Sequence, residues 1–97
     1  MSEFLSKHEI VERVAVLLEV SPPVLSTGST EPKSIFIAIN DQLGLGLKAS
    51  LSKAAMGRGI VEASGARWLP DFESRGGTVT RKGLQAVLEA VEYFLRP

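Results

Sequence analysis

The sequence contains no cysteine and only one histidine and one tryptophan among its 97 residues. The absence of cysteine excludes disulfide bridges, thiolate catalysis and zinc sites built on sulfur, and it is typical of a cytoplasmic protein. No apolar run reaches the roughly 18 residues that a membrane span needs. The N-terminal stretch MSEFLSKHEI is polar and acidic and carries no secretory signal pattern. We therefore expect a cytoplasmic protein that does not contact a membrane.

The chain also has few groups that could carry catalysis. His8 falls in the first turn of an expected helix, and spacing provides no partners with which it could form a metal site. Asp71 and Glu73 could hold a divalent cation weakly, but we interpret them as solvated loop acids. The stretches GLGL and GRG lack the spacing and the lysine or acidic partner of a nucleotide-binding fingerprint. We expect no enzyme, no cofactor and no metal.

The composition is that of one folded domain. Hydrophobic residues make up 44% of the chain and charged residues 23%, which is ordinary for a globular protein. The length suits a single small domain, and no repeat, low-complexity tract or linker interrupts it. Residues 1–97 are therefore predicted to form one domain, which could stand alone or belong to a longer protein.

The formal net charge is zero, but the charges are unevenly placed along the chain. Residues 1–46 carry three basic and six acidic residues, whereas residues 47–82 carry seven basic and three acidic ones. This asymmetry favours a polyanion facing the middle of the chain. Chance clustering on a solvated surface is the alternative.

The spacing of apolar residues predicts four helices. Ser6 and Glu9 have capping-box spacing, in which a hydroxyl and a carboxylate satisfy each other's backbone amides at a helix start. Proline and glycine residues mark most of the helix ends. The helices are expected from Ser6 to before Ser21, from Ser29 or Thr30 to before Gly44, from after Ser50 to Ser64, and from Thr80 to the end of the chain.

A β-hairpin is expected between the third and fourth helices. Residues 67–69 and 78–80 are short strand candidates, and a polar, glycine-containing stretch separates them. A lone hairpin is marginal in water, so it would have to lean on the helices. The predicted fold class is mainly α, with four helices and a small two-stranded β-hairpin.

In its order of elements the chain resembles the winged helix-turn-helix DNA-binding domains. The second helix, the connector GLGLKAS and the third helix correspond to the helix-turn-helix unit, and residues 67–80 correspond to the wing. The chain is also similar to small accessory domains of bacterial restriction or defence enzymes. The resemblance implies double-stranded DNA as partner, with the third helix in the major groove and the wing on phosphates or the minor groove. It also implies a fused or associated protein domain.

The resemblance and the charges together give a set of candidate DNA contacts. Arg81 and Lys82 begin a helix, where cations oppose the helix dipole, and this placement indicates either an external anion or merely a solvated turn. Gly57 and Gly59 flank Arg58, so the glycines either admit a phosphate to the helix or allow close packing. The third helix has no Asn or Gln to read adenine, so backbone contacts should dominate. The expected nucleic-acid-binding residues are Ser50, Ser52, Lys53, Arg58, Arg67, Arg75, Thr78, Arg81 and Lys82.

A second interpretation is a non-enzymatic helical module that binds another protein. The C-terminal stretch VEYFLRP places Tyr93, Phe94 and Leu95 together, which is more than one helical face can bury. Such an adaptor would not need the basic segment. Binding that persists at high salt would favour it, because phosphate contacts weaken steeply as salt rises.

Overall fold

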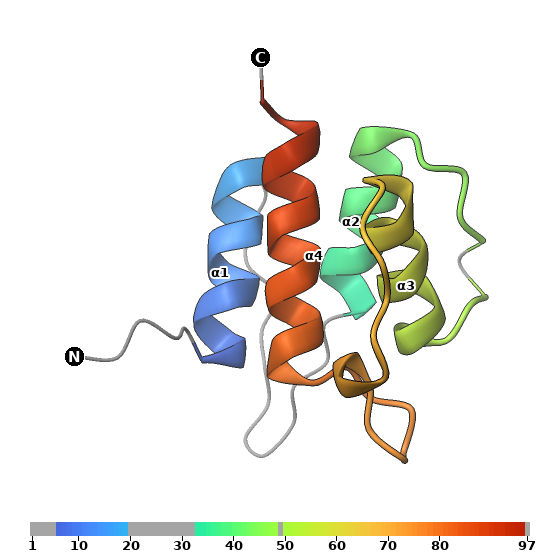
Figure 1. Ribbon diagram of the computed structural model, residues 1–97. Coiled ribbons are helices and arrows are strands. Elements are labelled where there is room, and N and C mark those ends of the chain that lie inside the picture. The colour runs from blue at the N-terminus through green and yellow to red at the C-terminus, as the bar shows by residue number, and fades with distance from the viewer. Residues whose placement is uncertain (1–5, 20–32, 49, 97) are drawn as a thin grey trace.

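The computed structural model describes residues 6–19, 33–48 and 50–96. These residues form four α-helices and one short 3-10 helix (Figure 1). The prediction of a mainly helical fold with four helices is therefore confirmed, whereas the caps expected at Ser29 or Thr30 lie outside the described residues. The elements are α1 (Lys7–Leu18), α2 (Lys33–Leu43), α3 (Lys53–Ala63), η1 (Pro70–Phe72) and α4 (Arg81–Phe94).

Hydroxyl side chains fix the starts of the helices. The capping box of α1 is present: the amide of Ser6 donates to Oε1 of Glu9 at 2.9 Å, and the amide of Glu9 donates to Oγ of Ser6 at 3.2 Å. Helix α3 begins after Ser52, whose Oγ accepts from the amide of Ala55 at 3.2 Å. These bonds satisfy amides that have no partner within the first turn.

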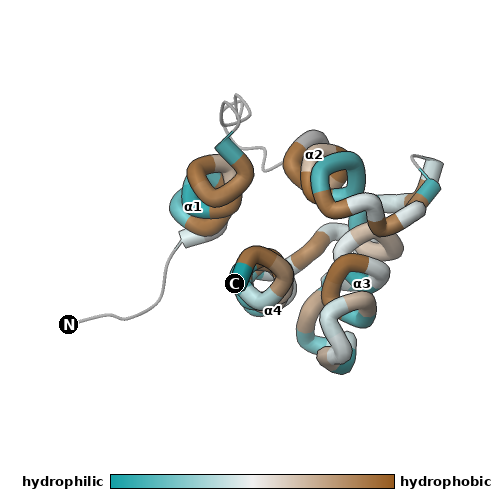
Figure 2. The backbone as a smooth tube through the Cα atoms, turned by 90° about the horizontal axis from the view of Figure 1, so that it is seen from above, coloured by the Kyte–Doolittle hydropathy of each residue, from teal (hydrophilic) through white to brown (hydrophobic). Residues whose placement is uncertain are grey.

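All four α-helices run in the same direction. The colours of Figure 1 show each of them beginning toward the lower end of the molecule and finishing toward the upper end. Figure 2 looks down on them from above, with α4 placed between α1 and α3. An extended segment covers more than twice the length per residue of a helix, so the segments 44–52 and 64–80 are long enough to return along the bundle. The starts of the helices therefore lie together at one end.

The apolar stripes of the helices meet in a single core. Large side chains such as Phe36 of α2 and Ile60 of α3 are fully buried, and each burial of this kind stabilises the fold by about 1.5–3 kcal/mol. Among the described residues, no polar or charged residue is buried. The buried apolar residues are Ile10, Val11, Val14, Ala15, Leu18, Ile35, Phe36, Ile39, Ala54, Met56, Ile60, Val61, Val79, Leu84, Val87, Leu88, Ala90 and Val91.

Two glycines let neighbouring side chains approach α3 closely. A Cβ atom at Gly57 would lie 3.2 Å from Cη2 of Trp68 and 3.5 Å from Cε2 of Phe36. At Gly59 it would lie 2.8 Å from Cδ2 of Leu47. Because side chains of the protein already cover both glycines, close packing explains them, and a phosphate cannot approach the helix there.

The side chain of Asn40 holds the segment that returns from α2 to α3. Its Nδ2 donates to the carbonyl of Leu47 at 2.9 Å, and its Oδ1 accepts from the amide of Leu47 at 2.8 Å. Gly44 supports the turn with a φ of 62°, which is a left-handed conformation that favours glycine. The predicted stop of the second helix before Gly44 is thus confirmed.

The predicted β-hairpin is wrong. The part of the chain that the structure describes contains no β-strand, and a single antiparallel bridge joins Glu73 and Val79. Residues 70–72 form η1 in place of the expected turn between strands. The segment that was expected to be a wing is therefore a loop that follows a short helical turn.

Local interactions explain why no strand forms at either candidate. The indole of Trp68 donates to Oε1 of Glu73 at 2.8 Å and packs edge-on against Phe72, with ring centroids 5.2 Å apart. Thr80 is committed to α4 and η1, because its Oγ1 caps the helix and also donates to the carbonyl of Asp71 at 2.7 Å. One residue of each candidate strand, Trp68 or Thr80, is therefore bonded to a nearby turn or helix start, and the two segments do not pair with each other as strands.

The structure also bears on membranes. None of the described helices combines the length and the apolar character that a membrane crossing requires.

Candidate nucleic-acid interface

The loop of residues 73–79, called loop 73–79 below, contains several internal hydrogen bonds. The amide of Ser74 donates to the carbonyl of Thr78 at 2.9 Å, and the amide of Gly77 donates to the carbonyl of Ser74 at 3.0 Å. The hydroxyls of Ser74 and Thr78 are 2.6 Å apart. The loop thus presents Arg75, which is exposed, at a defined turn.

Close packing joins this loop to the first turn of α4. Val79 is 3% exposed, and its Cγ1 would lie 2.7 Å from a Cβ atom at Gly83. The carbonyl oxygen of Phe72 approaches Gly83 even more closely. The amide of Thr80 donates to the same carbonyl at 2.9 Å. Loop 73–79, η1 and the start of α4 therefore form one unit.

Each of the four α-helices begins with a basic residue, and Lys82 follows in second position in α4. None of these helices carries a basic residue in its last turn. Because the helices start at the same end of the molecule (Figure 1), their basic first residues are brought toward one end of the fold. We call the first turns of the four helices together with loop 73–79 the cationic end. The basic first residues are Lys7, Lys33, Lys53 and Arg81.

This placement of charge works against the helices themselves. The start of a helix carries roughly half a positive charge, so a cation there destabilises it by about 0.3–1 kcal/mol. Only α1 has an acidic residue in its first turn, Glu9, which belongs to its capping box. Binding of an external anion at this end would offset this cost.

The structure brings most of the predicted contacts to this end, but not all of them. Arg58 lies in the middle of α3, exposed, with its Nε 3.3 Å from Oε2 of Glu62. Arg67 is exposed on the segment that returns from α3 to η1, outside the cationic end. The seven predicted residues at or beside the cationic end are Ser50, Ser52, Lys53, Arg75, Thr78, Arg81 and Lys82.

Acidic residues near the cationic end already have partners. Oδ2 of Asp71 lies 3.8 Å from Nζ of Lys82, and both side chains are exposed. Glu73 accepts the indole hydrogen bond of Trp68. An exposed pair such as Asp71 with Lys82 contributes at most about 1 kcal/mol, so an incoming anion can displace it.

Sequence analysis missed two basic residues of this end, Lys7 and Lys33. Each is the first residue of its helix, which the helix boundaries could have indicated. Their relevance depends on the parallel direction of α1 and α2, and no local pattern in the sequence encodes that direction.

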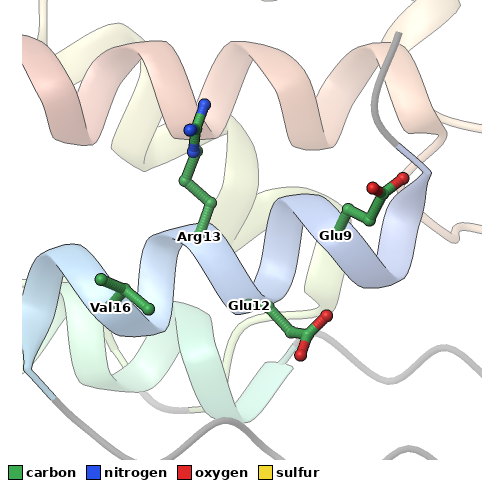
Figure 3. A pocket seen from close by; sticks show the side chains of 4 residues that line it. All are labelled: Glu9, Glu12, Arg13 and Val16. Atoms are coloured by element: carbon green, nitrogen blue, oxygen red, sulfur yellow. The ribbon is translucent and has the colours of Figure 1, made fainter.

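An open depression of 340 Å³ lies along α1, lined by Glu9, Glu12, Arg13 and Val16. Figure 3 shows Arg13 extending toward α4 and Glu12 pointing away from it. Glu9 is already used in the capping box. Within 6–19, 33–48 and 50–96, no group of three histidine or acidic side chains could hold a metal ion.

Comparison of the chain with protein-family models, characterised proteins and solved structures finds no match. The resemblance to winged helix-turn-helix domains therefore stays a prediction for the helices. The described residues contain no β-hairpin that could correspond to the wing.

Proposed function

We propose that this protein is a non-enzymatic DNA-binding module whose cationic end contacts the phosphate backbone of duplex DNA. One observation carries the proposal: a basic residue begins each of four helices that start at the same end of the molecule. Phosphates interact favourably both with the side chains and with the starts of the helices, so binding turns an unfavourable arrangement into a favourable one. The proposal does not require a wing.

Two features favour duplex DNA and contacts that are independent of base sequence. Proteins that bind single strands stack bases on aromatic side chains. Among the described residues, Phe36 in the first turn of α2 is fully buried, and Trp68 and Phe72 beside the cationic end are half-buried and packed against each other. The described first turns of α3 and α4 contain no Asn, and Gln85 of α4 is hydrogen-bonded to Glu89. Few side chains there could therefore form specific hydrogen bonds with the edges of bases. Phosphate contacts position a protein without specifying sequence.

The test is fluorescence anisotropy with a short labelled duplex, at low and at moderate salt. A triple variant removes three cations from the cationic end: Lys53→Ala, Arg75→Ala and Lys82→Ala. We expect dissociation constants in the micromolar range or weaker for the unmodified protein, and a loss of at least about tenfold for the variant. The slope of affinity against salt should fall by about 2–3, because each lost phosphate contact removes close to one counterion.

A matched variant removes three exposed arginines elsewhere: Arg58→Ala, Arg67→Ala and Arg96→Ala. It changes the net charge equally, so it separates a local interface from general electrostatic attraction. We expect it to retain most of the affinity. The proposal is wrong if duplex binding is absent at low salt, or if both triple variants lose affinity to the same extent.

A protein-binding module is the second candidate function. Tyr93 is 57% exposed and Leu95 is 43% exposed, so these two neighbouring residues leave apolar surface uncovered where α4 ends. Such a surface would bind a partner in a manner that tolerates high salt, whereas duplex binding would not.

A further inference from the structure

Acidic side chains gather at the opposite end of the same helices. Glu19 is the C-cap residue of α1, and Asp41 lies in the last turn of α2. Glu62 and Glu92 lie in the last turns of α3 and α4. Glu19, Asp41 and Glu62 are exposed, and Glu92 is half-buried. Glu62 is paired with Arg58, and the exposed Arg96 follows α4 at the same end, so acidic residues predominate there without being the sole charges. We call this end, where the helices finish, the acidic end (upper end of Figure 1).

The two ends are complementary in charge, although the chain as a whole has a formal net charge of zero. Basic residues begin the four helices and acidic residues finish them, so charge is separated along the direction of the helices. The molecule extends 26–31 Å along its principal axes, about three to four times the Debye length at physiological salt. The two ends therefore attract each other weakly within one molecule, and each is free to attract the opposite end of another.

We propose that the acidic end binds the cationic end of a second copy of this chain, so that copies associate head to tail. Figure 2 shows α1, α2 and α4 nearly end-on. A copy shifted along this common direction brings its basic helix starts to the acidic helix ends of the first copy. The exposed Tyr93 and Leu95 add apolar contact at this end. This contact is heterologous and does not close, so it generates chains of variable length.

The size of the ends limits the strength of this association. An end face 26–31 Å across offers on the order of 500–750 Å² per copy, below the ~800 Å² of a standard stable interface. Exposed ion pairs contribute little each and are screened by salt. The chains should therefore be reversible, favoured at high protein concentration and dissolved by salt. Duplex DNA and a second copy compete for the cationic end.

The first test is sedimentation velocity of the protein without nucleic acid, over a range of concentrations. At low salt, we expect the weight-average sedimentation coefficient to rise continuously with concentration. In ~1 M salt, where the Debye length is about 3 Å, it should return to the monomer value. A single monomeric species at all concentrations in low salt would overturn the proposal, and so would association that ignores salt.

A charge-reversal pair makes the test specific. One variant reverses the acidic end with Glu19→Lys, Asp41→Lys and Glu92→Lys. The other reverses the cationic end with Lys53→Glu, Arg75→Glu and Lys82→Glu. We expect neither variant to associate alone, because each has like charges at both ends, and we expect an equimolar mixture to associate. Circular dichroism checks that both remain helical. A mixture that stays monomeric, while both variants are folded, contradicts the head-to-tail contact.

Failure of this inference is distinguishable from failure of the proposed function. The variant reversed at the acidic end should still bind duplex, since the proposed DNA contacts lie at the other end. Association of the unmodified protein without any duplex binding would leave the inference standing and remove the DNA proposal. When both hold, an excess of short duplex should dissolve the chains.

Discussion

At the end where the four helices begin, each carries Lys or Arg as its first residue, and at the end where they finish, each carries Asp or Glu. An isolated helix is stabilised by the opposite arrangement at both ends. The hydroxyl caps at Ser6, Ser52 and Thr80 follow the rules of helix stability, whereas the charges beside them do not. Departures from local rules are expected at functional sites. The difference between the two ends therefore supports the proposal that partners, and not helix formation, determine where the charges lie.

The largest predicted effect comes from a substitution that disrupts the packing of the cationic end and leaves the acidic end unchanged. Gly83→Ala places a Cβ atom against the carbonyl of Phe72 and against Val79. Because the carbonyl belongs to the backbone, it cannot move aside easily, and we expect a loss of about 1–3 kcal/mol in the free energy of unfolding. Urea denaturation measures this loss. The same change should weaken duplex binding, since loop 73–79 no longer packs on α4.

Gly76→Ala is the matched control in the same loop. Its Cβ atom would meet only Oγ of Ser74, at 4.0 Å. We expect a change within about 0.5 kcal/mol. Equal losses at Gly76 and Gly83 would mean that the loop, and not its packing on α4, is the sensitive feature.

The second prediction concerns the acidic end, where Glu19 is a non-glycine residue in the left-handed region, with a φ of 58° and a ψ of 41°. Glu19→Gly removes this strain and also an acid at the end of α1. We expect a gain of about 1 kcal/mol in stability, measured by thermal or urea unfolding. Glu19→Ala removes the acid but keeps the strain. If Ala stabilises as much as Gly, the charge and not the conformation is what destabilises this end.

The helices and their caps could be predicted from the sequence, because their signals are local. Ser6 with Glu9, and Thr80 before an apolar stripe, act within one turn of chain. The absence of the wing could not be predicted from such local signals. The competition of Trp68 for Glu73, and of Thr80 for η1 and α4, becomes visible only when these residues are placed in space.

The candidate site was predicted in part for a similar reason. The basic residues of α3, of loop 73–79 and of α4 follow one another in a charged stretch of the sequence. Lys7 and Lys33 lie far from that stretch, and the fold brings their helices parallel to the others. Arg58 was included because it is basic and flanked by glycines, but those glycines serve packing. Charge along the chain thus predicted part of the cationic end, and the fold determines its extent.

The smallest predicted effect comes from reversing one charge at each end, so that the new charge suits the helix dipole. Lys53→Glu puts an acid at the start of α3, and Asp41→Lys puts a base in the last turn of α2. Both substitutions follow the helix dipole, so each should raise stability by about 0.3–1 kcal/mol at low salt. Differential scanning calorimetry at low ionic strength and in ~1 M salt measures the gain, which should shrink as salt screens the dipole.

The two substitutions should differ in function although they agree in stability. Lys53→Glu should weaken duplex binding, and Asp41→Lys should leave it intact, because only Lys53 lies at the cationic end. Such a result would mean that the protein gives up helix stability at one end to keep a binding surface. If instead Lys53→Glu lowers stability while Asp41→Lys raises it, the cation at the start of α3 serves the fold itself. The cationic end would then have a structural reason, and the argument for an external anion would lose its basis.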